Sequence, residues 1–464
     1  MPFTERRGNK WRVRWWSGKL DPESGKKLYD SKSGFDDEPE AYNYGLDQES
    51  ALRNDRYISR RDGAVLMKDY CRTWPDSLNV GHLREQAIRS MLRLYIVERW
   101  GEVAVADIKT SMFRAWEKQL RTQENERGKL LGKAYVDEII GVFRMLMDDA
   151  VTDEMRASSP VPAVNRRRGR YVKKAREKKR EMVMEDVLQL ASNALTYWGF
   201  PGFVFILTKA FTGMRPAELY ALRREYCHPA WPTADPDKDQ RREAAARYGA
   251  VHGLPAIRVE HQHQREKGAL GLFPPKYESQ RSLALPAFLA ELHEMLAASH
   301  GGEFVFTSIE GGLLANANFS YHYWRRIADG QDPTPPKQGG KARGGGSWRP
   351  LPGWPAVEAW AGKRLYLLRH GHKSWLDEDG HSRIATESRM GHEVAGVEGL
   401  YSMVTLGMEK QIAATLQQRW EKFVSQLPDG WELPPSPTPL PVDLQGWMKR
   451  QVKEAKEAWP QSGS

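Results

Sequence analysis

The chain has 464 residues, 40% of them hydrophobic and 28% charged, and its Lys and Arg residues exceed its Asp and Glu residues by ten. This composition excludes a mainly disordered or membrane-spanning chain, the length predicts two to four domains, and the positive excess fits a polyanionic partner without requiring one. With only Cys71 and Cys227, we expect no disulfide framework, no cysteine-based zinc site, and a reducing, cytoplasmic location.

Residues 1–60 are predicted to form a small sheet followed by a helix. At residues 11–15 apolar and basic side chains alternate, which is the period of a strand and places Arg12 and Arg14 together on the face away from the packed one. Two interpretations stay open, a solvated edge strand or a sheet face that contacts DNA. A helix is predicted over residues 38–53, and charges throughout the N-terminus predict no signal peptide.

Residues 62–160 are predicted to be helical, because apolar side chains recur there at helical spacing. One such stripe consists of Val136, Ile139, Ile140, Phe143, Met147 and Ala150. The interdomain segment 161–181 is the most basic of the chain, and its cations include Arg166, Arg167, Arg168, Arg170, Lys173 and Lys174. Such a run is usually a solvated linker, but between folded domains it can also lie along a phosphate backbone.

The largest region, residues 182–425, mixes helix and strand patterns. A Pro-rich connection and a short charged segment form the tail, residues 426–464. Together these patterns predict a multidomain α+β fold. It would consist of a small β-sheet and helix, then a helical domain, then a mixed, mainly α domain with a small β-sheet.

The first segment that suits phosphate chemistry runs from Phe211 to Leu219. Pro216 is well placed as the first residue of a helix, and Glu218 falls in its first turn. Arg215 is thereby held at a helix N-terminus, beside unpaired backbone N–H groups that favour anions. By itself an arginine at such a place is more often a surface ion-pair partner.

The second segment is a predicted β-hairpin, with a first strand over residues 257–265 and a turn at 268–271. A second strand follows, which contains Lys276 and residues 281–286, and the hairpin would hold Lys276 at its tip, within reach of a neighbouring groove. His261 and His263 would share one strand face, but no third ligand accompanies them, so we expect no metal.

The third segment begins a helix whose apolar face holds Leu365, Leu368, His372, Trp375 and Leu376. Tyr366 and Arg369 are three residues apart and project together on a different face of that helix. His372 is therefore expected to be a packed histidine rather than a catalyst.

The fourth segment is Met390-Gly391-His392, nine residues before Tyr401. A lone tyrosine near a histidine is usually structural. In their order along the chain, however, the four segments resemble the catalytic domain of the tyrosine recombinase (phage-type integrase) family. The resemblance covers about residues 182–425.

The resemblance assigns the individual residues. The first segment is similar to the family's Thr-Gly-x-Arg-x-x-Glu box and makes Arg215 the first catalytic arginine. Lys276, five residues before an arginine, matches the lysine of the family's β2–β3 turn. The third segment resembles the His-x-x-Arg box and makes Arg369 the second arginine. The fourth resembles the Leu-Gly-His box, followed by Tyr401 as the nucleophile.

The chain departs from the family's pattern at Tyr366, which stands where the family's box begins with His. Tyrosine can hydrogen-bond a phosphate, but it is a poor base at neutral pH because its ordinary pKa is about 10. The resemblance further implies that two arginines and His392 hold the phosphate oxygens, that Lys276 protonates the leaving oxygen, and that neither ATP nor a metal cofactor is needed.

The resemblance also implies partners. They are double-stranded attachment-site DNA, a homotetramer on that DNA, and an accessory DNA-bending or excision factor of a mobile element. More loosely, residues 1–60 resemble an arm-type and residues 62–160 a core-type DNA-binding domain. The helix after the nucleophile is expected to pack on its own domain, whereas the tail from residue 426 is the better candidate for exchange between protomers.

Three rival functions stay open at this point. Tyr366 would suit a catalytically silent DNA-binding factor on the same fold, although the other catalytic-type residues argue against it. A type IB topoisomerase shares similar chemistry, but the separate N-terminal DNA-binding segment disfavours it. A basic RNA-binding protein is disfavoured because none of the usual RNA-binding motifs is present.

Overall fold

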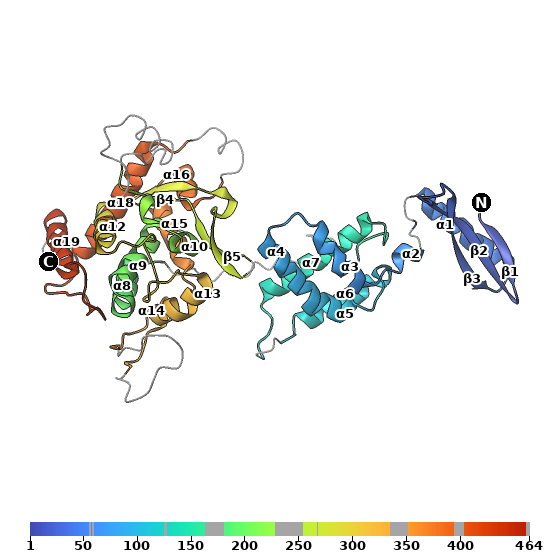
Figure 1. Ribbon diagram of the computed structural model, residues 1–464, viewed down its shortest axis with the longest axis horizontal. Helices are drawn as coiled ribbons and strands as arrows, with labels where there is room; N and C mark the ends of the chain where they lie inside the picture. Colours follow the sequence, from blue (N-terminus) through green and yellow to red (C-terminus); the bar gives the residue numbers. More distant parts are fainter. Residues whose placement is uncertain are drawn as a thin grey trace. The chain divides into compact units, whose positions relative to one another are not determined.

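The computed structural model describes residues 1–54, 57, 60–124, 128–162, 181–227, 254–266, 268–334, 351–393 and 403–460. The chain folds into two compact units, Met1–Lys174 and Ala175–Ser464 (Figure 1). Tyr401 and the six named cations of the basic segment lie outside the described residues. No helix in the described ranges is both long and apolar enough to cross a bilayer.

The first unit begins with an antiparallel sheet of order β1-β2-β3 and a helix packed on one face of it (Figure 1). The elements are β1 (Phe3–Arg7), β2 (Lys10–Leu20), β3 (Lys27–Phe35) and α1 (Glu38–Arg53). Val13 and Trp15 of β2 are fully buried beneath α1. The helix approaches closely at Gly45, where a Cβ would lie 2.7 Å from a methyl carbon of Val13.

The edge-strand interpretation of residues 11–15 is wrong, since β2 is the central strand of this sheet. Arg12 and Arg14 lie on the face opposite the helix. Arg12 donates to Ser31 Oγ at 2.7 Å, and the Arg14 guanidinium lies 5.3 Å from the centre of the Phe3 ring. The alternating pattern therefore predicted the two faces correctly, while strand order depends on partners that the pattern does not encode.

The rest of the first unit is helical, as predicted. Its elements are α2 (Arg60–Gly63), α3 (Met67–Thr73), η1 (Trp74–Ser77), α4 (His82–Met91), η2 (Leu92–Val97), α5 (Glu98–Trp100), η3 (Val105–Asp107), α6 (Thr110–Leu120) and α7 (Lys133–Thr152). All six residues of the predicted α7 stripe are buried. They join Trp100 and Trp116 in one core, where the rings of Phe113 and Phe143 stack at 5.7 Å.

The second unit is built around two adjacent, largely buried helices, α8 (Met184–Trp198) and α9 (Phe200–Thr212). The other helices are α10 (Pro216–Tyr220), η4 (Arg224–Tyr226), η6 (Lys276–Glu278), α12 (Ala287–Ser299), α13 (Asn316–Phe319), η7 (Ser320–Trp324), α14 (Arg325–Asp329), α15 (Leu367–Glu378), α16 (Arg383–Met390), α18 (Leu406–Val424) and α19 (Leu444–Ala458). Apolar residues on every side of α9 explain its central position.

The predicted hairpin is correct in pairing residues 257–259 with the strand at 281–284, but wrong at its turn and tip, because residues 269–273 form a strand of their own. The strands are β4 (Ala256–Val259), β5 (Gln262–Glu266), β6 (Ala269–Phe273) and β7 (Arg281–Ala284); β4 pairs with β7, and β5 with β6. Lys276 lies in η6 between β6 and β7, not at a hairpin tip. Pro274 and Pro275 end β6, because proline has no N–H for the ladder, and Tyr277 then turns the chain with φ of +63°.

The described part of the tail packs on its own unit within the single chain, and exchange between protomers stays a prediction. Leu444, Trp447 and Met448 of α19 are buried in the same core as Trp420 of α18. The Trp447 indole donates to Glu291 of α12 at 2.8 Å. The apolar residues of α19 are thus buried within the chain. We did not expect this burial from the sequence, because the segment is rich in charge and follows a proline-rich connection.

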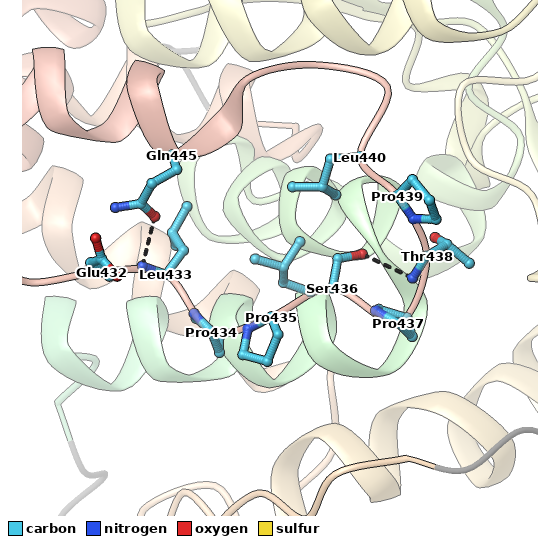
Figure 2. A pocket seen from close by; sticks show the side chains of 11 residues that line it. Glu432, Leu433, Pro434, Pro435, Ser436, Pro437, Thr438, Pro439, Leu440 and Gln445 are labelled. Carbon is cyan, nitrogen blue, oxygen red and sulfur yellow. Dashed lines mark hydrogen bonds between the residues drawn. The ribbon is translucent and has the colours of Figure 1, made fainter.

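The proline-rich connection lies against α8. It lines a pocket (Figure 2), to whose lining Leu195 of α8 also belongs. The Gln445 side chain accepts a hydrogen bond from the Leu433 N–H at 3.0 Å and so ties the start of α19 to the connection. The helix α18 likewise faces inward: Ile412 and Leu416 are fully buried, which confirms its predicted packing on its own domain.

Candidate active site

Arg215 lies where the sequence predicted, at the N-terminus of α10. Helix α9 ends at Thr212 and is followed by Gly213, whose φ is +63° and where a Cβ would lie 2.6 Å from the His372 ring. Glycine is therefore required at that turn. The Glu218 carboxylate accepts from both the Arg215 N–H and its Nη1, each at 2.7 Å.

A buried carboxylate joins Arg215 to a second arginine. Arg281 of β7 donates from Nη2 and Nη1 to the two oxygens of Glu218, at 2.8 and 3.2 Å. Burial by itself would raise the pKa of Glu218, but Arg281 and Arg215 outweigh it and lower that pKa to about 2. Glu218 is therefore ionised and holds both guanidinium groups in place.

The third arginine of the cluster, Arg369, comes from α15 and is buried, with only 1% of its surface exposed. Its Nη1 donates to Gly213 O at 2.7 Å, and its Nη2 lies 3.1 Å from His392 Nε2. Burial, followed by the charges of Arg215 and Arg281, lowers the pKa of Arg369 to about 10. Arg369 thus stays charged at neutral pH.

The end of α16 gathers the three arginines. The carbonyls of residues 389, 390 and 391 accept in turn from Arg281 Nε at 2.8 Å, from Arg369 Nη2, and from Arg215 Nη2 at 3.0 Å. The last carbonyls of a helix have no partner within it and carry partial negative charge, so they favour cations. One backbone segment therefore sets the relative positions of guanidinium groups from β7, α15 and α10.

The side chain of Arg389 fixes the end of α16 to the elements packed against it. It is buried, donates to His372 Nε2 at 3.1 Å, and lies 3.7 Å from a carboxylate oxygen of Glu409 on α18. Its Nη2 also donates to the carbonyls of Phe211 and Ala284, both at 3.1 Å. The His372 Nδ1–H donates to a backbone carbonyl, and burial followed by Arg389 lowers the His372 pKa well below its ordinary value. His372 is thus packed, as the sequence predicted, and it is neutral.

His392 is the most exposed member of the cluster, with 42% of its side chain accessible. Its Nδ1 lies 2.7 Å from Glu387 Oε2, and Lys373 pairs with the other oxygen of that carboxylate. Burial would raise the pKa of Glu387, but Lys373 and His392 outweigh it and lower that pKa. Sequence reasoning missed Glu387, although an acid five residues before the histidine, on the preceding helix, is a signal that could have found it.

Lys276 and Tyr366 border the cluster. Ser279 Oγ accepts from Arg215 Nη1 at 3.1 Å and donates to the Lys276 carbonyl at 2.9 Å, so the lysine's turn is tied to the first arginine. The Lys276 ammonium itself is exposed and lies 4.7 Å from the centre of the Tyr277 ring. Tyr366, the residue before α15, is 38% exposed.

A second group missed in the sequence is Lys209, which lies within apolar α9 and is fully buried. Its Nζ donates to the Met214 carbonyl, beside Arg215, and lies 6.0 Å from the centre of the Tyr366 ring. His263 Nδ1 contacts the Leu314 carbonyl at 2.9 Å and so has a partner in the chain itself. Within the described ranges, no group of three His, Cys, Asp or Glu side chains is placed to hold a metal ion.

The structure therefore brings Arg215, Arg369 and His392 together, places Lys276 and Tyr366 at their border, and leaves Tyr401 outside the described residues. Two guanidinium groups, that of Arg369 buried, lie beside an accessible imidazole, and such a cationic, hydrogen-bonding cluster is of the kind that suits an anionic phosphodiester.

No protein-family model matches the sequence, and no curated protein matches it. Solved structures do. Two structures of the Tn1549 transposon integrase in complex with circular intermediate DNA each superpose with a TM-score of 0.50 and 14% identity, over 74% of this chain and 97% of that chain. A lambda integrase tetramer bound to a Holliday junction is similar over 85% of this chain and 98% of that chain, with 14% identity and a TM-score of 0.44. At such identities the likeness concerns the fold.

Proposed function

We propose that this chain, which has the fold of the tyrosine recombinases, is a site-specific DNA recombinase that integrates or excises a mobile element. It would cut attachment-site DNA and rejoin it through a 3′-phosphotyrosyl link to Tyr401. The observation that carries the proposal is the end of α16, where Arg215 and Arg369 bind neighbouring carbonyls beside the accessible His392.

The chemistry follows from the charge of the substrate. Arg215 and Arg369 hold the non-bridging oxygens of the scissile phosphate, where the transition state gains negative charge, and His392 adds a hydrogen bond to them. The Tyr401 hydroxyl loses its proton to solvent as its oxygen attacks phosphorus, and the bond to the 5′-oxygen breaks. Lys276 gives that oxygen a proton and regains one from solvent. The 5′-hydroxyl of a partner strand then attacks and releases the tyrosine, so the phosphodiester bond energy is retained.

Tyr366 has a binding role in this proposal rather than a basic one. It is accessible at the border of the cluster, where its hydroxyl can donate a hydrogen bond to the phosphate. At neutral pH a phenol keeps its proton, so it cannot act as the general base in place of the histidine at the first position of the family's box.

Several partners belong to the same proposal. Arg12 and Arg14 would contact DNA from the sheet face opposite α1, and the cations from Arg166 to Lys174 would contact the phosphate backbone. Four protomers would hold two duplexes, and an accessory DNA-bending or excision factor would set the direction, in the cytoplasm. The helical residues 62–160 would add a core-type DNA contact.

The proposal is tested by covalent trapping. A duplex selected from a random library by binding to the full-length protein supplies the site, and the same sequence is rebuilt with a nick so that the cut fragment diffuses away. Denaturing electrophoresis should show protein attached to DNA in the wild type and none in the Tyr401→Phe variant, with binding of the intact duplex equal in both.

The runner-up function is a catalytically silent DNA-binding factor on the same fold, and Tyr366 is the observation that favours it. It predicts duplex binding with no adduct from the wild type. A two-site assay then separates a recombinase from a topoisomerase, because only the recombinase exchanges strands between two duplexes.

A further inference from the structure

The ring of His392 is held from both sides. Its Nδ1 lies 2.7 Å from the Glu387 carboxylate, which accepts a hydrogen bond and cannot donate one while ionised. Its Nε2 lies 3.1 Å from Nη2 of Arg369, which always donates. The only assignment that satisfies both contacts is a neutral ring with its proton on Nδ1 and a lone pair on Nε2.

This assignment is incompatible with a His392 that donates to a phosphate. An anion that binds between His392 and Arg369 offers only acceptor oxygens, so a lone pair on Nε2 would face it without a hydrogen bond. The contact becomes favourable once Nε2 gains a proton, and Arg369 Nη2 is then free to turn its hydrogen bond toward the same anion.

The charged groups around His392 determine whether its imidazole keeps the added proton. On α15, Arg369 disfavours a positive imidazole, and Lys373 is partly neutralised by Glu387. Arg215 and Arg281, which contact the backbone at residues 389–391, add further positive charge. Glu387, on α16, is the carboxylate in direct contact with the ring, and it is held ionised. A carboxylate in this position orients an imidazole and stabilises its protonated form.

We propose that Glu387 is a positioning residue that lets His392 take up a proton when the scissile phosphate binds, so that His392 contacts the phosphate as an imidazolium. The proposal rests on the recombinase function and names a step in it that the arginines alone do not provide. The proton comes from solvent on binding, and it returns to solvent when the phosphate leaves.

The test uses the full-length protein and the nicked duplex selected above. Single-turnover rates of adduct formation are measured from pH 6 to pH 9.5 for the wild type, Glu387→Gln and Glu393→Gln. The last variant removes the same charge from an exposed residue next to His392. Glutamine can still accept from Nδ1–H, so the ring stays oriented while the negative charge is lost.

With the duplex saturated by protein, we expect Glu387→Gln to form adduct about a hundredfold more slowly than the wild type at pH 8, the lower end of what lost acid–base assistance costs, and to recover as the pH falls toward 6. Glu393→Gln should follow the wild-type profile. A uniform loss at every pH would make Glu387 merely structural and overturn the proposal, and so would an unchanged profile.

Proton uptake gives a reading that does not need cleavage. In the Tyr401→Phe background, the heat of duplex binding at pH 8 is compared in buffers of different ionisation enthalpy. Proton uptake should be smaller with Glu387→Gln, and equal uptake would contradict the proposal. An absent adduct from the wild type would instead count against the recombinase function, so the two failures are distinguishable.

Discussion

At the scale of single residues, the second unit contains a lysine that is buried within an apolar helix. Lys209 is fully buried in α9, and burial, followed by the charge of Arg369, lowers its pKa well below the ordinary value of 10.5. Between the lowered pKa and 10.5, the unfolded chain binds one more proton than the folded chain does. The free energy of unfolding therefore rises with pH through that range.

Lys209→Met should consequently raise the melting temperature by a few degrees at pH 7, because the variant no longer has to release a proton on folding. Its advantage should shrink as the pH rises toward 10. Thermal unfolding of the full-length proteins at pH 7 and pH 9.5 measures this, with Lys410→Met, an exposed lysine of α18, as the control. An advantage of equal size at both pH values would contradict the lowered pKa.

At the scale of elements, one side chain of α16, that of Arg389, contacts four neighbouring elements. Arg389 binds carbonyls at the end of α9 and of β7, the ring of His372 on α15, and faces Glu409 on α18. Removing a buried charge leaves its partner charge without compensation, and such losses cost about 3–5 kcal/mol.

Arg389→Met is therefore expected to lower the free energy of unfolding by about 3–5 kcal/mol. Adding Glu409→Met should restore part of the loss, because it removes the uncompensated carboxylate. Denaturant unfolding provides the measurement, and Arg383→Met, on the exposed side of the same helix, is the matched control. Equal effects from the two arginines would mean that the burial of Arg389 contributes little.

At the scale of the whole molecule, the tail stabilises the unit on which it packs. Trp447 is buried against Trp420, with ring centres 6.1 Å apart. Replacing a large buried aromatic residue by alanine costs about 3–5 kcal/mol. Trp447→Ala should destabilise the chain by this amount in denaturant unfolding, whereas Arg450→Ala, which removes the exposed partner of the same Glu291, should have little effect.

Concentration dependence separates packing within one chain from exchange between chains. If α19 packs on its own unit, the melting temperature should not change between low and high micromolar protein. A tail contributed by a second protomer would make the midpoint rise with concentration, since mass action then favours the assembled state.

The sequence predicted what depends on neighbouring residues. The helix from Glu38 to Arg53, the apolar stripe of α7, and the place of Arg215 at a helix N-terminus all follow from short-range patterns and are confirmed. The tyrosine recombinase fold followed from four short motifs in order, and the superposed structures confirm it.

What the sequence could not predict depends on distant partners. The hairpin pattern joined residues 257–259 to the strand at 281–284 correctly, but it did not predict that residues 269–273 form a strand paired with 262–266. The ion pair of Glu218 with Arg281 spans 63 residues. The burial of Lys209 was not predicted, because a single charged residue does not interrupt the apolar pattern of a helix. The roles of Lys276 and Tyr401 stay predictions of the sequence.

The three arginines of the site are positioned by consecutive backbone carbonyls, so their positions depend on the number of residues in this stretch and not on the identity of its side chains. Their acceptors are the successive backbone carbonyls of residues 389, 390 and 391, which every amino acid possesses. An exchange such as Met for the family's usual Leu at position 390 leaves each acceptor where it was. Deleting or inserting one residue there would give every guanidinium the wrong carbonyl, so this short stretch should tolerate substitutions far better than changes of length.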